Sequence, residues 1–193
     1  MSLSEIRAGR RDDAAQLAVL VDIASHGMAS AMWREMSESG VPPAQIGRER
    51  ATREVGGFSY RHAHIVELGG EIAGCSVSYW MERANSDLSD VPPRVRELVE
   101  LELQVPDHWY VNVLAVYPEY RGKGLGSQLL EHADSLGRDA NSSGMAIIVA
   151  SGNQGARRLY DRHGYRFLDQ RQATPYPGGP SKQAWVLMAK PNK

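Results

Sequence analysis

The spacing of apolar residues at the start of the chain predicts one strand followed by three helices. Residues 3–8 alternate between apolar and polar side chains, which is the period of a half-buried β-strand. Apolar residues then recur at helical spacing as far as Ala24, and Asp12-Asp13 stand where acidic residues cap a helix. Between residues 28 and 55 we expect two short helices, one on each side of the turn at Pro42-Pro43.

A hairpin and an irregular segment come next. The extended stretches 62–68 and 71–81 are joined by Gly69-Gly70, and two extended runs joined by a pair of glycines predict a β-hairpin. The segment 82–108 has no strand pattern, but residues 94–103 carry apolar side chains at helical spacing. Because long connections are often functional, we interpret 82–108 as an insertion between two central strands.

The second half of the chain alternates between strands and helices. The predicted elements are a strand that begins near Val111, a helix from Leu125 to about Asn141, a strand at 146–151, a helix that ends at Gly164, and strands at 165–168 and 183–188. Together with the first half, this order predicts an α/β fold. The 193 residues suffice for one well-cored domain, so we expect a single domain, 1–193.

Composition narrows the class of protein. The chain is 42% hydrophobic and 23% charged, which is typical of globular proteins, and its net charge of -1 argues against a nucleic-acid binder with a broad basic surface. Cys75 is the only cysteine, so an intrachain disulfide is excluded. The central apolar run 146–150 is far shorter than the roughly 20 residues of a membrane helix, and the charged N-terminal region is unlike a signal peptide. We therefore expect a cytoplasmic protein that binds neither nucleic acid nor a membrane.

The stretch from Val111 to Ser127 reads VNVLAVYPEYRGKGLGS and predicts a strand, a glycine-rich loop and a helix. Glycines at 122, 124 and 126 let the backbone approach a ligand, and N–H groups at the start of a helix bind anions. Two known phosphate loops do not fit. A P-loop requires a glycine where Tyr117 stands, and a dinucleotide fingerprint requires one where Ser127 or Leu129 stands.

Two motifs resemble those of the GCN5-related N-acetyltransferase (GNAT) superfamily. Residues 121–126, Arg-Gly-Lys-Gly-Leu-Gly, match the acyl-CoA pyrophosphate loop Arg/Gln-x-x-Gly-x-Gly/Ala. Residues 153–165 resemble the second CoA motif, Asn-x-x-Ala-x-x-Leu-Tyr-x-x-x-Gly-Phe, with Tyr165 in place of the phenylalanine. The resemblance covers most of residues 3–190. It implies a GNAT fold, with a mixed, mostly antiparallel sheet of about seven strands and helices on both faces.

The resemblance also implies a function and a donor site. The expected function is transfer of an acetyl group from acetyl-CoA to the amine of a small molecule (an amino acid, a polyamine or a drug-like amine) by direct attack in a ternary complex. We expect no metal ion, and we consider a homodimer as one oligomeric state of the protein. The cofactor-binding residues that the resemblance implies are Leu114, Ala115, Val116, Arg121, Gly122, Lys123, Gly124, Leu125, Gly126, Ser127, Asn153, Ala156 and Tyr160.

The resemblance gives Tyr160 a catalytic role. A phenol stays protonated at neutral pH and could give its proton to the departing thiolate, so Tyr160 is the expected acid. The alternative is that Tyr160 only fills the core between helix and sheet. The rival functions are a noncatalytic acyl-CoA-binding or sensing domain, an acetyltransferase acting on protein N-termini or lysines, and an enzyme that transfers an acyl group other than acetyl.

The group that acts as the general base and deprotonates the acceptor amine is less well defined by the sequence. Many family members carry a glutamate on the strand before the loop, whereas this chain has Tyr110 and Asn112 there and no acidic residue between Trp109 and Pro118. An ammonium group with a pKa near 10.4 costs roughly 4.6 kcal/mol to deprotonate at pH 7, so the site or the solvent must help. The candidates are Glu100, Glu102, Asp107, His108 and solvent, with Glu102 placed first because the insertion could fold it over the cleft.

Several other residues admit a functional and a structural interpretation. Trp33, Met36, Tyr110 and Asn112 are candidates for the acceptor-binding wall, and the alternative for Trp33 and Met36 is core packing. Cys75 is interpreted as a small buried residue rather than as a nucleophile. His62 and His64 are spaced to share one strand face, and we expect a solvated or hydrogen-bonded pair rather than a metal site.

Overall fold

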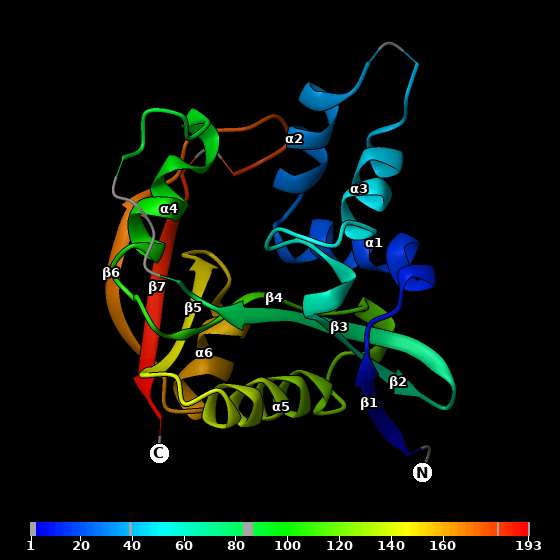
Figure 1. Ribbon diagram of the computed structural model, residues 1–193, viewed down its shortest axis with the longest axis vertical. Helices are drawn as coiled ribbons and strands as arrows, with labels where there is room; N and C mark the ends of the chain where they lie inside the picture. The colour runs from blue at the N-terminus through cyan, green and yellow to red at the C-terminus, as the bar shows by residue number, and fades with distance from the viewer. Residues whose placement is uncertain (1–2, 39, 83–86, 181, 193) are drawn as a thin grey trace. The chain divides into compact units, whose positions relative to one another are not determined.

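The computed structural model describes residues 3–38, 40–82, 87–180 and 182–192, and it contains a seven-stranded mixed sheet flanked by helices. Figure 1 traces the elements in chain order. The helices of four or more residues are α1 (Ala14–Ala24), α2 (Met28–Met36), α3 (Pro43–Ala51), α4 (Arg96–Glu102), α5 (Leu125–Asp139) and α6 (Gln154–Arg162). Short 3₁₀ turns are η1 (Arg11–Asp13), η2 (Tyr60–His62), η3 (Pro93–Val95) and η4 (Pro118–Tyr120).

The strands are β1 (Ser4–Ala8), β2 (Ala63–Leu68), β3 (Glu71–Trp80), β4 (Trp109–Val116), β5 (Gly144–Ala150), β6 (Arg166–Gln172) and β7 (Ala184–Pro191). Their order in the sheet is β1-β2-β3-β4-β5-β7-β6. β4 and β5 run parallel, while the β1–β2, β2–β3, β5–β7 and β6–β7 pairs are antiparallel. The predicted seven-stranded mixed sheet is therefore confirmed.

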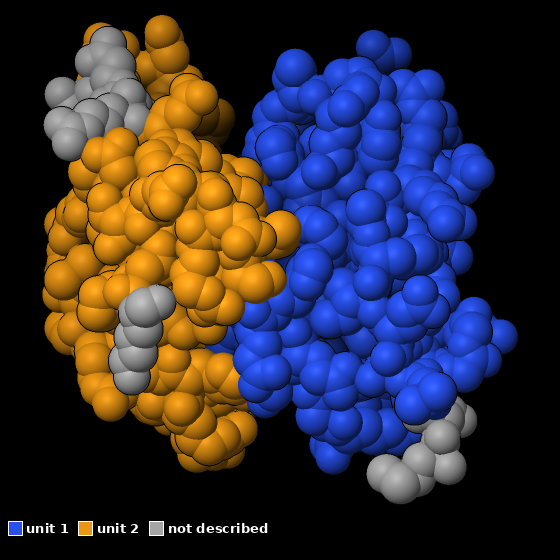
Figure 2. All heavy atoms as spheres, turned by 60° about the horizontal axis from the view of Figure 1, so that its bottom comes forward, with its two compact units in different colours: residues 1–78, 112–132, 177–179 blue, residues 79–111, 133–176, 180–193 orange. Residues whose placement is uncertain are grey.

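The chain divides into two compact units that interleave along the sequence (Figure 2). Unit 1 comprises residues 1–78, 112–132 and 177–179, and unit 2 comprises residues 79–111, 133–176 and 180–193. Both β4 and α5 pass from one unit into the other. The single domain expected from the sequence stays a prediction.

Unit 1 contains the β1–β2–β3 ladder and the three helices α1, α2 and α3, which lie together in Figure 1. Its core joins the buried side chains of α1 to residues such as Ile65 and Cys75 on the inner strands. The predicted hairpin and the two short helices on either side of the Pro42-Pro43 turn are confirmed.

Asp13 takes part in capping, and one other expectation for unit 1 is corrected. The Asp13 carboxylate accepts from Arg10 N–H (2.7 Å) in the capping box of η1, directly before α1, and also from the Arg7 guanidinium (2.8 and 2.9 Å); it makes no cap to α1 itself. Burial opposes ionisation of this carboxyl, but the hydrogen bonds from Arg7 and Arg10 prevail and lower its pKa. His62 lies in η2 rather than on β2, so it does not share a strand with His64.

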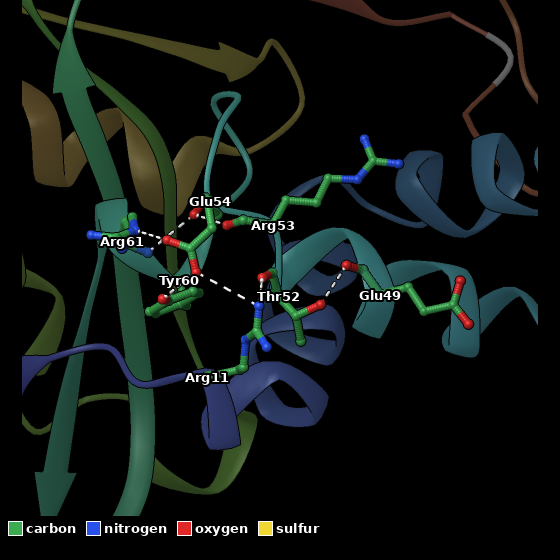
Figure 3. A network of polar contacts seen from close by, with 8 residues as sticks. Arg11, Glu49, Thr52, Arg53, Glu54, Tyr60 and Arg61 are labelled. Atoms are coloured by element: carbon green, nitrogen blue, oxygen red, sulfur yellow. Dashed lines mark hydrogen bonds and ion pairs between the residues drawn. The ribbon is translucent and has the colours of Figure 1, made fainter.

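A polar network joins the segment after α3 to η1 and η2 on unit 1 (Figure 3). The carboxylate of Glu54 accepts a hydrogen bond from the Tyr60 phenol (2.8 Å) and from the Arg61 guanidinium, and it forms an ion pair with Arg11 (3.6 Å). Arg11 also donates to the Thr52 carbonyl oxygen (3.3 Å). These contacts link the connection between α3 and β2 to η1.

Unit 2 contains the β5–β7–β6 ladder, together with α4, which packs on β6 and β7. β6 extends beyond the predicted 165–168, because Asp169 to Gln172 pair with Leu187 to Ala184 although their side chains are polar. A second polar cluster lies in this unit. Lys190 Nζ donates to the Asp134 carboxylate (2.6 Å) and to the His163 carbonyl oxygen (3.0 Å), and it lies 4.6 Å from the centre of the Tyr165 ring.

Candidate active site

The glycine-rich loop of unit 1 joins η4 to the first turn of α5. Gly122 and Gly124 have φ angles of 77° and 79°, in the left-handed region where side chains are disfavoured, and a Cβ at either position would meet no atom within 4 Å. The loop surface is therefore open at both glycines. The hydrogen-bond ladder of α5 reaches back to the Gly124 carbonyl, which accepts from Gln128 N–H (3.1 Å).

This loop has the electrostatic character of an anion site. The N–H groups of Leu125, Gly126 and Ser127 precede the ladder at the positive end of α5, and the first turn of α5 carries no acidic residue. Arg121 Nε donates to the Val116 carbonyl oxygen (3.2 Å), and Lys123 Nζ lies 5.2 Å from the centre of the Tyr120 ring. These residues fit the diphosphate of an acyl-CoA.

The strand before the loop is held tightly against β3 within unit 1. A Cβ at Gly74 would lie 2.4 Å from the Ala115 carbonyl oxygen, so only glycine allows this approach. Tyr117 N–H donates to the Ala73 carbonyl oxygen (2.9 Å). Ala115 is buried, and Leu114 and Val116 pack against a buried apolar cluster. This cluster is formed by Val66, Ala73, Leu125 and Leu129.

The acceptor-wall candidates of unit 1 differ in exposure. Trp33 is 4% exposed, belongs to the core and stacks on Phe58 with ring centroids 6.1 Å apart, as the core-packing interpretation predicted. Met36 is 47% exposed and Asn112 is also exposed. Of these three candidates, only Met36 and Asn112 therefore have side chains at the surface.

In unit 2, Asn153 directly precedes α6 and Tyr160 lies on it. Asn153 Oδ1 accepts from Ala156 N–H (3.1 Å) and caps the helix. Tyr160 is 4% exposed, with its ring centroid 6.0 Å from that of Tyr165. Burial raises the pKa of Tyr160, so its phenol holds its proton at neutral pH.

Glu102, also in unit 2, is the last residue of α4 and is half-buried. Burial raises the pKa of Glu102 to about 7, although a hydrogen bond with the Tyr110 phenol acts in the opposite direction. Tyr110 is 3% exposed, and its ring meets that of Tyr79 edge to face, with centroids 5.8 Å apart and planes at 72°. A carboxyl group with this pKa can take up and release a proton near neutral pH.

Two of the other candidate bases, Glu100 and His108, have polar partners of their own. Glu100 forms an ion pair with Arg171 (3.3 Å), and His108 Nδ1 lies 3.0 Å from the Pro106 carbonyl oxygen. Asp107 has a left-handed backbone, with φ of 61°, and its N–H donates to the Met81 carbonyl oxygen (2.9 Å). The sequence did not point to Tyr79, because only the pairing of β3 and β4 brings it to Tyr110.

Two further interpretations can be compared with the structure. Cys75 is fully buried and burial raises its pKa to about 12, so it is a small core residue and not a thiolate nucleophile. The His64 ring lies beside that of His132, with centroids 4.5 Å apart. Within the described parts of the chain, no three His, Cys, Asp or Glu residues are grouped so as to hold a metal ion. Among the same residues, no helix has both the length and the apolar composition to cross a membrane.

Comparison with known proteins shows which family shares these features. The model of the acetyltransferase (GNAT) family matches residues 29–165. An N-acetyltransferase from Staphylococcus aureus Mu50 is 20% identical, with 96% of this chain and 100% of that chain covered and a TM-score of 0.62. A polyamine N-acetyltransferase from Drosophila melanogaster is 15% identical, with 98% and 100% covered and a TM-score of 0.66.

A third solved structure contains the expected co-substrate. The yncA protein from Salmonella typhimurium, solved with its cofactor acetyl-CoA, is 18% identical, with 98% of this chain and 94% of that chain covered and a TM-score of 0.62. At these identities the structures share the fold with this chain. No curated protein matches the sequence.

Proposed function

Because the chain belongs to the acetyltransferase (GNAT) family, we propose that it is an acetyl-CoA-dependent N-acetyltransferase acting on a small-molecule amine. The observation that carries this proposal is the open glycine loop at Gly122 and Gly124, which leads into the positive end of α5. Such a loop suits the diphosphate of acetyl-CoA, the acetyl donor of this family.

The residues proposed to hold acetyl-CoA follow from the two motifs. Backbone N–H groups from Gly122 to Ser127 bind the diphosphate, with the charges of Arg121 and Lys123 adding attraction. Main-chain groups of Leu114, Ala115 and Val116 bind the pantetheine arm, and Asn153 and Ala156 contribute from the start of α6. When bound, acetyl-CoA supplies the acetyl group as a thioester.

Two side chains are proposed to move protons. Glu102 takes a proton from the ammonium form of the acceptor, which makes the nitrogen lone pair available. Tyr160 keeps its phenol protonated at neutral pH and donates to the departing sulfur. Met36 and Asn112, both exposed, are proposed to contact the acceptor.

A small amine is the proposed acceptor class. The net charge of -1 does not suggest a nucleic-acid-bound substrate, and the D. melanogaster protein with the same fold is a polyamine N-acetyltransferase. The lack of a carboxylate on β4 favours a second candidate, a noncatalytic acyl-CoA-binding domain. A protein N-terminus or lysine as acceptor is the third.

Calorimetry with acetyl-CoA and with CoA tests the donor site. We expect a Kd from micromolar to low millimolar for the wild-type chain and weaker binding for Arg121→Ala. Arg61→Ala, which removes an exposed arginine of the Figure 3 network, is the matched control and should bind normally. The absence of binding to either compound would exclude the proposed function.

A thiol-release assay over polyamines, amino acids, drug-like amines and a peptide with a free N-terminus then separates the candidates. Turnover with a small amine supports the proposal, and turnover confined to the peptide supports a protein acetyltransferase. Binding without turnover on any acceptor supports the noncatalytic domain.

A further inference from the structure

Two buried polar atoms of unit 2 have no hydrogen-bond partner among the residues that the structure describes. They are Oε2 of Glu97 on α4 and Nε2 of Gln183, which directly precedes β7. Resting on the proposed function, we propose that these two side chains bind the acceptor and that the acceptor is an amino acid. Glu97 accepts a hydrogen bond from its amino group, and the Gln183 amide donates to its carboxylate.

The burial of these two atoms points to a ligand. Gln183 is 6% exposed, and its Nε2 and the Oε2 of Glu97 have almost no contact with solvent. Buried polar atoms nearly always have a partner, because an unsatisfied donor or acceptor keeps the full cost of leaving water. A ligand that offers a donor to Glu97 and an acceptor to Gln183 removes that cost at both atoms.

α4 lies along β6, and three polar contacts join the two elements in step. From beyond the end of α4 towards its start, the contacts are Gln104 Nε2 to the Asp169 carboxylate (2.7 Å), Glu100 to Arg171 (3.3 Å), and the Thr174 hydroxyl to Glu97 Oε1 (2.5 Å). Helix and strand therefore run in opposite directions, and Glu97 lies beside the end of β6. Thr174 holds one oxygen of the Glu97 carboxylate and leaves Oε2 for a ligand.

The register of β6 and β7 places Gln183 on the sheet face that α4 covers, at the level of Glu97. Arg171, which pairs with a glutamate of α4, lies opposite Trp185. Two residues further along, Ala173 N–H donates to the Gln183 carbonyl oxygen (2.9 Å). Because every second residue of a strand points to the same face, the Gln183 side chain shares the face of Arg171. Glu97 and Gln183 therefore meet the same end of the contact between α4 and the sheet.

The backbone around both groups is held in place without a ligand. The Gln183 carbonyl oxygen also accepts from Gln172 Nε2 (2.6 Å), and Arg94 in η3 donates to the Pro175 carbonyl oxygen (3.1 Å). The positions of Glu97 and Gln183 are thus set by contacts other than those of their unpartnered atoms. A site that is already ordered loses less entropy when its ligand binds.

The pair lies close to residues proposed to hold acetyl-CoA. Ala184, which follows Gln183, accepts from Ser151 N–H at its carbonyl oxygen (2.8 Å) and donates its own N–H to Ser151 Oγ (3.0 Å). Ser151 stands two residues before Asn153, which caps α6 in the second CoA motif. An acceptor bound by Gln183 is therefore held beside the end of β5, where the proposed donor site begins.

Among the described residues, no cation is paired with the Glu97 carboxylate. The nearby guanidinium groups have other printed partners. Arg96 donates to two backbone carbonyl oxygens (3.4 and 3.5 Å), and Arg171 pairs with Glu100. The ammonium group of an acceptor can therefore supply the positive charge that Glu97 lacks.

The two atoms together select the class of amine. A polyamine offers N–H donors to Glu97 but no oxygen to the Gln183 amide, whose donor stays unsatisfied. An amino acid offers both, because its amino group and its carboxylate are bonded to one carbon. The contact with Glu97 also survives loss of a proton, since a neutral amine still has two N–H bonds before it attacks the thioester.

Paired acceptors test this assignment on the wild-type chain and need no variant. In the thiol-release assay, each amino acid is compared with the amine in which hydrogen replaces its carboxylate, such as phenylalanine with phenethylamine. We expect kcat/KM to be about ten times higher, or more, for an amino acid than for its amine. Equal values, or a preference for the amines, overturn the inference.

Two variants assign the preference to the two residues. In Gln183→Leu, KM should rise about tenfold for the amino acid and stay the same for the amine. In Glu97→Gln, which keeps an oxygen for Thr174, KM should rise for both compounds while kcat stays nearly unchanged. Gln170→Leu and Glu71→Gln change exposed side chains and are the controls that should behave as the wild type. An amino-acid preference that persists in Gln183→Leu contradicts the assignment.

Calorimetry separates failure of this inference from failure of the proposed function. The preferred amino acid is titrated into the full chain saturated with CoA, and it should bind the wild type about ten times more tightly than Gln183→Leu. If acetyl-CoA binds and amines are acetylated but this difference is absent, only the inference is wrong. If acetyl-CoA does not bind, the proposed function is wrong and the inference fails with it.

Discussion

In unit 1, the imidazole rings of His64 on β2 and His132 on α5 have their centroids 4.5 Å apart and their planes at 60°. Nearby apolar residues of the same two elements also pack together, because Val66 of β2 lies in one cluster with Leu125 and Leu129 of α5. His64 faces Ser76 across the β2–β3 ladder, and the Ser76 hydroxyl is buried without a hydrogen-bond partner among the described residues. The pair therefore lies where a positive charge is poorly solvated.

The buried position of His64 predicts that unit 1 loses stability at acidic pH. Burial, with a smaller contribution from His132, lowers the pKa of His64 to about 4. A folded-state pKa below the unfolded value of about 6.5 means that stability is retained above pH 6.5 and lost as the pH falls from 6.5 towards 4. Urea unfolding at pH 7 and at pH 4.5 should show a loss of about 1–2 kcal/mol assigned to His64, after allowance for its partial exposure.

The matched variants separate His64 from the general acid response. His64→Gln should remove that part of the pH dependence. His26→Asn changes an exposed histidine in a left-handed conformation that asparagine tolerates, and it should keep the wild-type dependence. Equal pH dependence in His64→Gln and in the wild type would contradict the assignment.

In unit 2, the Asp134–Lys190 pair predicts a strong coupling in stability. Their side chains are 12% and 15% exposed, and Lys190 also lies against the Tyr165 ring. Lys190→Met leaves a buried carboxylate without its cation and should cost about 3 kcal/mol in the free energy of unfolding. Adding Asp134→Asn should recover part of that loss, since the uncompensated charge is removed. Additive effects in the double-mutant cycle would mean that the two groups do not interact.

How far the sequence predicted the structure depended on the range of the interactions involved. The hairpin at Gly69-Gly70 and the loop at 121–126 depend on local turn chemistry, and the elements that they join are confirmed. Asp13 was expected to cap a helix, and its carboxylate does cap the 3₁₀ turn before α1, but the sequence did not show that Arg7 of β1 also pairs with it. The Tyr79–Tyr110–Glu102 contacts depend on strand pairing and on the packing of an insertion, for which local sequence carries no pattern.

Gly74 is expected to be indispensable for the approach of β3 to β4. In Gly74→Ala the new Cβ would lie 2.4 Å from the Ala115 carbonyl oxygen and 3.0 Å from the Val116 Cα, and backbone atoms cannot move aside cheaply. We expect a loss of about 3 kcal/mol in stability together with weaker acetyl-CoA binding. Gly152→Ala is the control, because its Cβ would meet nothing within 4 Å and its backbone is not left-handed. Thermal unfolding of the two variants should therefore differ clearly.

Gly124 and Gly178 allow backbone strain to be separated from ligand binding. Their φ angles are 79° and 81°, and a Cβ at either position would meet no atom within 4 Å. Each change to alanine should thus cost about 1 kcal/mol in stability. Only Gly124→Ala should also weaken acetyl-CoA binding, because only Gly124 lies in the proposed diphosphate loop. Equal calorimetric Kd values for the two variants would argue against that assignment of the loop.

Tyr160→Phe tests the proposed acid. The substitution removes one oxygen atom from a buried ring whose pKa is raised by burial, so the packing of α6 should survive. If Tyr160 gives its proton to the departing thiolate, kcat should fall by about two orders of magnitude while the acetyl-CoA Kd stays nearly unchanged. Tyr60→Phe removes the phenol that donates to Glu54 and should leave turnover at the wild-type level. Unchanged kcat in Tyr160→Phe would assign Tyr160 to the core and leave protonation of the thiolate to another group or to solvent.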